Sequence, residues 1–210
     1  ARFKLRVKAE ISELDWICVA LRGPGATGAE SGSSPESCLA VPFSWGGVTG
    51  VDLLGAAAEF PPGVRRCGAA SWESVRVEAG IPVMGAELDE RTIAAEADLL
   101  ERCVSFTKGC YTGQELVARL DARGNKVARR LRGLVFAAGG DRSPSGGAEV
   151  VVGEKVVGQL TSVAWSPGLS TTVALAYLHR SVDPPCPVVV RAKSAPDTWH
   201  AEARVLPIMG

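Results

Sequence analysis

Residues 155–161 read Lys-Val-Val-Gly-Gln-Leu-Thr, and residues 171–177 read Thr-Thr-Val-Ala-Leu-Ala-Tyr. Both stretches are short, rich in β-branched and apolar residues, and bounded by Gly, Pro or Ser, which is typical of β-strands. Four further stretches with the same composition and punctuation lie at 127–136, 150–152, 188–192 and 201–206. Short strands separated by turn residues at regular intervals predict a small antiparallel β-barrel or sandwich over residues 131–210.

The part of the chain before this strand-rich region begins with strand signals. Residues 3–11 alternate between apolar and charged side chains, and residues 16–21 form a continuous apolar run, so we expect a strand at each, the second of them buried. Residues 23–35 are rich in Gly and Ser and predict an exposed loop. Residues 39–54 then contain two short strand candidates, which Gly46-Gly47 separates.

Helix signals follow these strands. The expected elements are a helix over 70–79, a short helix around 90–100, a short strand over 104–106 and a helix over 114–121. Ser71 is the expected cap of the first helix, and Gly80 is its expected stop. Gly124 and Asn125 are expected to end the last helix. The sequence therefore predicts an α+β fold with an α+β domain over residues 1–130 and a β-barrel over residues 131–210.

Composition narrows the functional class. Hydrophobic residues make up 46% of the chain and charged residues 22%, and the formal net charge is zero. These values are typical of a globular protein, and they give no global attraction to nucleic acid or to an anionic membrane. No apolar run approaches the ~20 residues that a membrane-spanning helix needs, and the start lacks the layout of a signal peptide. We therefore expect a cytoplasmic protein with no membrane partner and no direct contact with nucleic acid.

The cysteines do not form a scaffold. The six of them are Cys18, Cys38, Cys67, Cys103, Cys110 and Cys186. Their spacing contains no C-x-x-C pair, which argues against a structural disulfide framework or a zinc site. Cys110 differs from the others because two glycines flank the Cys-Tyr pair and a predicted helix follows. The free N–H groups of a helix N-terminus, together with Lys108, favour the thiolate form of such a thiol, which can act as a nucleophile, a redox centre or a metal ligand.

Residues 108–115, Lys-Gly-Cys-Tyr-Thr-Gly-Gln-Glu, resemble the K-G-C-[YF]-x-G-Q-E signature of YgfZ-type proteins. These proteins are folate-binding relatives of the glycine-cleavage T-protein, an aminomethyltransferase, and of a mitochondrial iron–sulfur assembly factor. Residues 76–82 resemble the R-x-E-x-G-x-P segment of this superfamily, and residues 157–162 resemble the G-x-(V/L)-T-S strand of its C-terminal barrel. The resemblance covers roughly residues 70–180, and the motifs stand in the family's order.

The resemblance implies a folate-binding core of ferredoxin-like halves followed by a small antiparallel β-barrel, with the N-terminal part of the core absent from this chain. It implies tetrahydrofolate or a derivative as cofactor, with Glu78 as acceptor for the pterin N–H groups. It also implies that Cys110 is the working thiol and a possible ligand of a transient iron–sulfur cluster. The other residues expected at the folate site are Arg76, Lys108, Tyr111, Gln114 and Glu115. One departure is the stretch 92–96, which keeps the family's acid but lacks its Pro.

The function implied is that of an accessory protein for assembly or repair of iron–sulfur enzymes, including radical enzymes that thiolate tRNA. Its partners would be an iron–sulfur carrier or the client enzymes. Two alternatives stand beside it: a folate-dependent aminomethyltransferase, and a non-catalytic binding module. T-proteins resemble the 108–115 stretch but lack its Cys, so Cys110 favours the accessory protein over the aminomethyltransferase.

A basic cluster follows the motif, and only Asp121 opposes it. Its members are Arg119, Arg123, Lys126, Arg129, Arg130 and Arg132. The sequence leaves three interpretations of this cluster open: a solvated surface, a seat for the anionic glutamate tail of folate, or a contact with RNA.

Overall fold

The structure is a computed structural model, and it describes residues 10, 12–26, 38–138, 143–193 and 195–209. Most of the strand expected at 3–11, and most of the loop expected at 23–35, therefore lie outside the described residues. The chain divides into two compact units, Ala1–Arg66 and Cys67–Gly210. The expected boundary near residue 130 falls inside the second unit, at the start of its first strand, and a domain boundary there stays a prediction.

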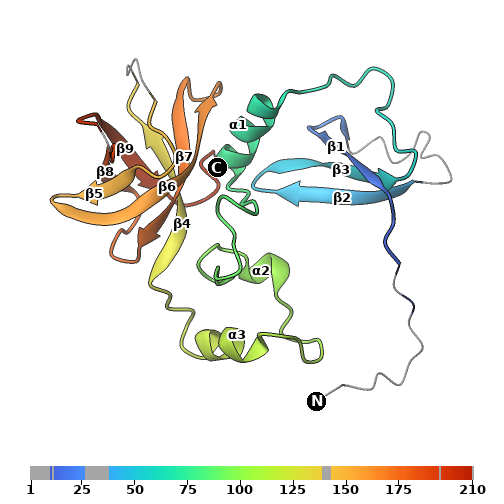
Figure 1. Ribbon diagram of the computed structural model, residues 1–210, viewed down its shortest axis with the longest axis horizontal. Helices are drawn as coiled ribbons and strands as arrows, with labels where there is room; N and C mark the ends of the chain where they lie inside the picture. Colours follow the sequence, from blue (N-terminus) through green and yellow to red (C-terminus); the bar gives the residue numbers. More distant parts are fainter. Residues whose placement is uncertain (1–9, 11, 27–37, 139–142, 194, 210) are drawn as a thin grey trace. The chain divides into compact units, whose positions relative to one another are not determined.

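The first unit contains a three-stranded antiparallel sheet in the order β1-β3-β2 (Figure 1). Its strands are β1 (Ile17–Arg22), β2 (Leu39–Trp45) and β3 (Val48–Gly55). The two glycines predicted to separate β2 from β3 do so, with φ values of 51° and 81° that suit a two-residue hairpin turn. The strand expected at 16–21 is confirmed as β1, but its burial alternates, because only one face of β1 packs against the sheet's core.

Three helices lie in the described part of the second unit: α1 (Ala69–Ala79), α2 (Leu100–Cys103) and α3 (Gln114–Asp121). Gly80 ends α1 in the left-handed conformation (φ 69°), as predicted. Ser71 is not the cap, because α1 starts earlier, after Gly68, and no side chain caps it. None of the helices in the described residues is long and apolar enough to cross a membrane.

The segment between α1 and α3 differs from the prediction. Residues 90–98 form turns, and the helix expected there is displaced to α2. Residues 104–106 pair with no strand. Both differences have the same origin, since short apolar stretches suit a helix or a strand equally well until tertiary contacts decide between them.

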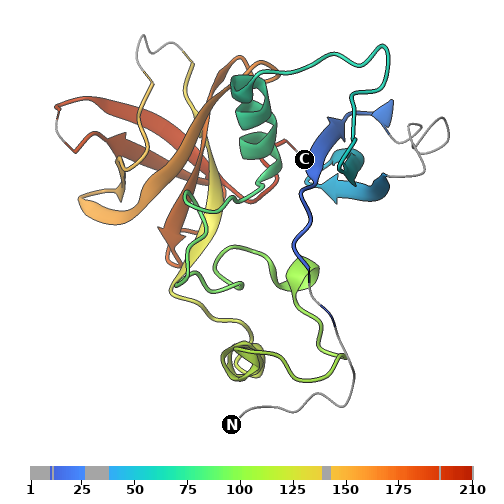
Figure 2. The ribbon, with the colours of Figure 1, turned by 45° about the vertical axis from the view of Figure 1, so that its right-hand side comes forward.

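Six strands of the second unit close into an antiparallel barrel in the order β4-β7-β6-β5-β8-β9 (Figures 1 and 2). They are β4 (Arg129–Phe136), β5 (Glu149–Val152), β6 (Lys155–Ser166), β7 (Thr171–His179), β8 (Cys186–Arg191) and β9 (Thr198–Arg204). The strand-rich region is thus a barrel rather than a sandwich. Pairing of β4 with β9, the first and last strands in this order, closes the barrel and removes exposed sheet edges.

β7 is the strand that joins the barrel to α1. All its residues except His179 are buried. Ala174 and Ala176 face the barrel interior, while Val173 and Leu175 pack with Val77 of α1 on the outside. Burial on both faces explains why the sequence of β7 is a continuous apolar run rather than an alternating one. The helix α1 lies along β6 and β7 (Figure 1), which fixes its C-terminal end against the barrel.

Candidate functional site

A buried ion pair anchors the end of α1. Arg76, in the last turn of α1, donates from Nη1 to Oε2 of Glu87 at 3.1 Å, and the two side chains are 3% and 0% exposed. The other guanidinium N–H groups donate to the carboxylate of Glu73, the carbonyl of Ile81 and the hydroxyl of Ser162. All five N–H donors of the guanidinium therefore have protein acceptors. This makes Arg76 a structural anchor, and its contact with folate stays a prediction.

Glu87 is the centre of this network. Its Oε1 accepts from the hydroxyls of Thr161 and Ser162, each at 2.6 Å, and its Oε2 also accepts from the backbone N–H of Val83 at 3.2 Å. The hydroxyl of Tyr177 donates to the backbone carbonyl of Glu87 at 3.0 Å, and burial raises the pKa of that hydroxyl to about 12. The Thr-Ser pair of β6 and the helix motif around Arg76 thus meet on one buried carboxylate.

The backbone around Glu78 is held from the other side by the C-terminal segment. The carbonyl of Glu78 accepts the N–H of Ile208 at 2.8 Å. A Cβ at Gly80 would lie 2.9 Å from the side chain of Leu206, and the φ of Gly80 favours glycine as well. The helix end, the turn after it and residues 206–208 are therefore packed closely, which leaves the backbone of Glu78 little freedom to move.

The side chain of Glu78, by contrast, is incompletely satisfied. Its Oε1 is buried and has no hydrogen-bond partner within the part of the chain that the structure describes. A buried carboxylate oxygen without a donor is costly. The location adds to the cost, because a negative charge in the last turn of α1 faces the negative end of the helix dipole. N–H donors from a ligand would relieve both penalties, and Glu78 is the acceptor that the sequence singled out.

The 108–115 motif forms an exposed turn that leads into α3. Cys110 is exposed, and α3 starts after Gly113, whose φ is 85°. Gln114 accepts the backbone N–H of Tyr111 at 3.3 Å, and the Lys108 ammonium lies 5.1 Å from the centroid of the Tyr111 ring. Glu115 is exposed in the first turn of α3. The motif residues therefore interact with one another while Cys110 stays accessible to a partner.

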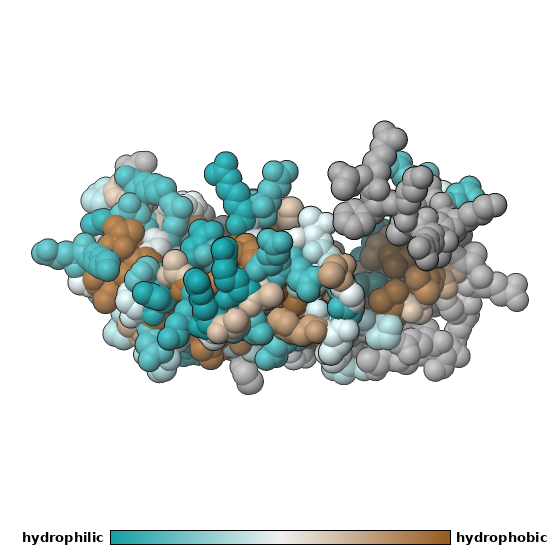
Figure 3. All heavy atoms as spheres, turned by 90° about the horizontal axis from the view of Figure 1, so that it is seen from below, coloured by the Kyte–Doolittle hydropathy of each residue, from teal (hydrophilic) through white to brown (hydrophobic). Residues whose placement is uncertain are grey.

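The structure does not bring the two predicted centres together. In both ribbon views α1 lies against the barrel, whereas α3 lies apart from it, beyond α2 (Figures 1 and 2). The space-filling view from below, the side on which α3 lies in Figure 1, is largely hydrophilic over the middle of the molecule (Figure 3). Within the described ranges, no group of three or more His, Cys, Asp or Glu side chains is arranged to hold a metal ion.

The basic cluster separates into two sets. Arg119, Arg123 and Lys126 are exposed at the end of α3 and beyond it. The arginines of β4 are engaged locally: Arg129 pairs with Glu96 at 2.9 Å, and Arg130 donates to a backbone carbonyl. The cluster is therefore divided between α3 and β4, and the arginines of β4 partly serve to attach the preceding segment. Its role in binding an anion stays a prediction.

The residue that sequence reasoning missed is Glu87. It stands in a polar stretch, and nothing in its neighbourhood distinguishes it from a solvated acid. The available signal was the Thr161-Ser162 pair, since two adjacent hydroxyls on a barrel strand need a buried acceptor. The structure supplies that acceptor from 74 and 75 positions away in the chain.

The barrel and the chain around it are similar to known proteins. The profile of the glycine cleavage T-protein C-terminal barrel domain matches residues 129–203, which corresponds to the barrel from the start of β4 to near the end of β9. An aminomethyltransferase of Streptomyces avermitilis is 39% identical over 123 residues, which cover 58% of this chain and 32% of that protein. An aminomethyltransferase of Streptomyces coelicolor is 35% identical over 156 residues, which cover 73% of this chain and 38% of that protein. The chain thus spans about a third of the length of these curated relatives.

Among solved structures, the glycine cleavage system aminomethyltransferase T from Bartonella henselae is similar in fold. The TM-score is 0.72 at 20% identity, over 93% of this chain and 60% of that one. At this identity the likeness concerns the fold, which is the mixed α/β fold with a closed barrel that T-proteins have. The barrel therefore resembles the C-terminal barrel of T-proteins in sequence, part of the chain resembles aminomethyltransferases, and the chain shares the T-protein fold.

Proposed function

We propose that this chain is part of a tetrahydrofolate-binding protein of the aminomethyltransferase type, which passes a one-carbon unit to tetrahydrofolate. The relatives that it matches carry the name aminomethyltransferase. The single observation that carries the folate assignment is the buried Oε1 of Glu78, which has no donor among the described residues. A pterin ring offers an amino group and ring N–H groups, which are the donors that a carboxylate accepts best.

The chemistry of the surroundings suits this role. The Glu78 backbone is held by Ile208 and by the α1 end, so its carboxylate can be oriented before a ligand arrives. A rigid acceptor loses little entropy on binding, which favours affinity and selectivity. Under this proposal Glu78 binds and orients the pterin, Arg76 positions the helix end, and tetrahydrofolate supplies the acceptor nitrogen for the one-carbon unit.

Calorimetric titration of the full chain with tetrahydrofolate under anaerobic conditions tests the folate assignment. Glu78→Gln keeps the size of the side chain but removes its charge, and we expect it to weaken binding by about 10-fold to 100-fold, which is the loss typical of a charge-assisted hydrogen bond. Glu101→Gln is the matched control, because Glu101 is an exposed acid in α2. Equal affinity for the wild type and Glu78→Gln would remove Glu78 from the site. If neither this chain nor the complete protein that contains it bound folate, the proposal would be refuted.

A second candidate function rests on a different observation, the exposed Cys110 within the K-G-C-Y-T-G-Q-E motif. In this reading the chain is part of a YgfZ-type accessory protein, and the thiolate of Cys110 serves iron–sulfur enzymes, including those that thiolate tRNA. Lys108, Tyr111, Gln114 and Glu115 would then shape the surface around the thiol. The aminomethyltransferase names of the relatives favour the first function, while this cysteine favours the second.

A complementation experiment separates the two. The gene is deleted in its host, and aconitase activity and glycine cleavage are measured before and after rescue with wild type, Cys110→Ala and Cys103→Ala. Cys103 is also an exposed thiol and serves as the control. Loss of aconitase activity that wild type and Cys103→Ala restore, but Cys110→Ala does not, supports the accessory role. Loss of glycine cleavage that all three proteins restore supports the transferase, and unchanged activities in the deletion strain would favour a binding module.

A further inference from the structure

One side of α3 combines apolar and cationic side chains. Four residues at the i, i+3, i+4 and i+7 spacing of a helix share this side, and we call them the α3 face: Leu116, Arg119, Leu120 and Arg123. The helical path reaches the last of them, because Ala122 keeps helical dihedral angles and the N–H of Arg123 donates to the carbonyl of Leu120 at 3.0 Å. Two leucines and two arginines are thus interleaved on one surface.

The described chain leaves the α3 face largely uncovered. No residue of α3 is buried, and Leu116 is 39% exposed. No α3 residue belongs to a hydrophobic cluster of the described residues. In both ribbon views α3 lies apart from the barrel (Figures 1 and 2). The leucines of the α3 face therefore contribute to no core of the second unit.

The helix α3 also lacks the usual sources of helix stability. It has 8 residues, against the about 12–15 that an isolated helix needs to be even marginally stable. No side chain caps its start after Gly113. Most helical stability in proteins comes from packing of an apolar face, and α3 has little of it. A partner would supply this packing, as in complexes that bury one face of an amphipathic helix.

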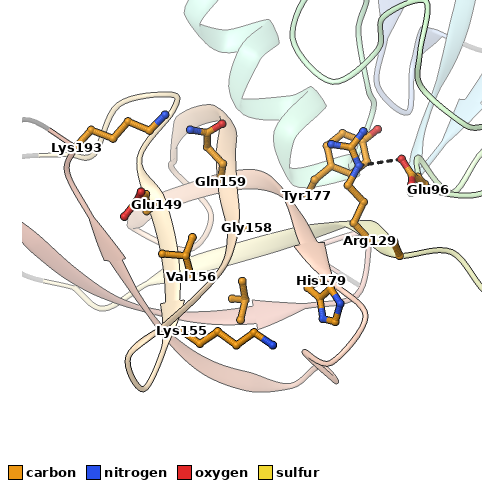
Figure 4. Close-up of a pocket in the computed structure, with 12 residues that line it drawn as sticks. Glu96, Arg129, Glu149, Lys155, Val156, Gly158, Gln159, Tyr177, His179 and Lys193 are labelled. Carbon is orange, nitrogen blue, oxygen red and sulfur yellow. Dashed lines mark hydrogen bonds and ion pairs between the residues drawn. The ribbon is translucent and has the colours of Figure 1, made fainter.

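The arginines of the α3 face are available to a partner. Within the described residues, the exposed side chains of Arg119 and Arg123 have no hydrogen bond or ion pair. Arg129 of the same basic cluster shows the contrast, because its Nε donates to Glu96 at 2.9 Å and its guanidinium lies 4.5 Å from the centroid of the Tyr177 ring (Figure 4). The two guanidinium groups of the α3 face therefore await acceptors from outside this part of the chain.

The acids of α3 do not neutralise this face. Glu115 and Asp121 are each adjacent in sequence to a leucine of the face, so each points about 100° away from that leucine around the helix axis. Asp121 also accepts a hydrogen bond from the side-chain amide of Asn125 at 3.1 Å. The α3 face is therefore both apolar and positively charged, and the surface complementary to it is apolar and negatively charged.

Two other occupants fit the α3 face less well. RNA is bound by surfaces that combine cations with aromatic side chains on which bases stack, and the α3 face has no aromatic residue. A second copy that paired through the same face about a two-fold axis would bring arginines against arginines, and like charges at an interface are costly. A surface rich in carboxylates avoids both problems, because the planar fork of Arg suits carboxylate oxygens.

We infer that the α3 face is a docking site for a protein whose contact surface presents apolar side chains flanked by carboxylates. The leucines pack against the apolar side chains of this partner, and the arginines pair with its carboxylates. Because α3 begins directly after the turn that carries Cys110, a partner bound there lies near this exposed thiol. The inference does not rest on folate binding, since Glu78 takes no part in it.

The test uses two fluorescent amphipathic peptides of about 15 residues, with leucines at helical spacing and either glutamates or lysines between them. Each is titrated into the full chain at low ionic strength, and binding is followed by fluorescence anisotropy. Leu116→Gln and the double variant Arg119→Glu/Arg123→Glu probe the two components of the face. Val156→Gln and Arg180→Glu are the matched controls, because Val156 is 46% exposed on β6 and Arg180 is exposed after β7. Circular dichroism confirms that the variants fold alike.

We expect the glutamate peptide to bind saturably and the lysine peptide not to bind. Leu116→Gln should weaken binding about fivefold. The double variant should reverse the preference to the lysine peptide, while both controls should match the wild type. Amide hydrogen exchange in α3 should slow when the glutamate peptide binds, because docking stabilises a helix that is otherwise exposed to solvent.

Absence of saturable binding by the glutamate peptide, equal affinity for both peptides, or equal weakening by the controls would overturn the inference. The other occupants are measured on the same variants by sedimentation for a dimer, with a single-stranded RNA oligonucleotide, and with vesicles that contain phosphatidylserine. If the glutamate peptide did not bind and Leu116→Gln abolished one of these interactions instead, the α3 face would belong to that occupant.

Discussion

Replacement of Glu87 by Gln tests whether the buried network holds α1 to the barrel. The change keeps the size of the side chain and removes its charge. It also places an amide NH₂ where the carboxylate now accepts from Arg76, Val83, Thr161 and Ser162. At least one of these donors would then face another donor without solvent access, because the Glu87 side chain is 0% exposed.

The size of the expected loss in stability follows from the burial of the Arg76–Glu87 ion pair. Removal of one partner from a buried ion pair costs about 3–5 kcal/mol. The Arg76 guanidinium retains Glu73, whose side chain is 38% exposed, so part of its charge stays compensated. We therefore expect Glu87→Gln to lower the free energy of unfolding by about 3 kcal/mol, the lower end of that range. This is a large share of the about 5–15 kcal/mol that stabilises a typical protein.

Urea unfolding followed by circular dichroism measures this loss. Glu90→Gln is the control, because Glu90 is an exposed acid in the same segment. The double variant Arg76→Leu/Glu87→Gln should lose less than the sum of the two single variants, since the two side chains interact directly. A loss below about 1 kcal/mol relative to Glu90→Gln, or strict additivity of the two changes, would show that the buried pair contributes little.

Three further predictions concern single residues. Burial raises the pKa of Tyr177 to about 12, against about 10 in an unfolded chain. The stabilisation by the neutral Tyr177 hydroxyl is therefore complete below about pH 10 and is lost between about pH 10 and pH 12. A tyrosinate absorbance titration should show a late step that Tyr177→Phe removes. Gly158→Ala should lower the free energy of unfolding by about 1–3 kcal/mol, because the added Cβ would lie 2.1 Å from the Tyr177 carbonyl oxygen. Gly109→Ala is the control and should be tolerated, because its Cβ meets no atom within 4 Å. Equal melting temperatures of the two variants would contradict this. Glu78→Gln should leave the free energy of unfolding unchanged or raise it by about 0.3–1 kcal/mol, because it relieves the helix dipole; a clear destabilisation would mean that Glu78 is structural.

The elements that local pattern predicts are those whose pattern is unambiguous. The helix over 114–121 and the stop of α1 at Gly80 agree with the structure. The strands of the barrel were found because Gly, Pro and Ser separate them clearly. The strand pattern alone allowed a barrel or a sandwich, because both have the same strand lengths and turns. The resemblance to the T-protein superfamily predicted the barrel, and the structure confirms it through pairings such as that of β4 with β9.

The candidate site was predictable only where a motif carried it. Arg76 and Glu78 stand two residues apart in one motif, yet they have opposite roles in the structure. All N–H donors of Arg76 have acceptors, whereas Glu78 has a buried oxygen that no donor among the described residues contacts. No sequence pattern distinguishes these roles, because the acceptors of Arg76 come from Glu87 and Ser162, which are 11 and 86 residues away. Burial and long-range hydrogen bonding decide which member of a motif is free to bind.

This division of roles also makes the two candidate functions independent of each other. Glu78 lies on a helix end that Gly80, Ile208 and the Arg76 network hold rigidly, as a binding site for a planar ring requires. Cys110 lies in an exposed turn, as transfer to a large partner requires. Because the described contacts of one centre do not include the other, Glu78→Gln should change folate affinity without altering the reactivity of the thiol, and Cys110→Ala should do the reverse. A variant at either position that impaired both would show that folate and thiol act in one site.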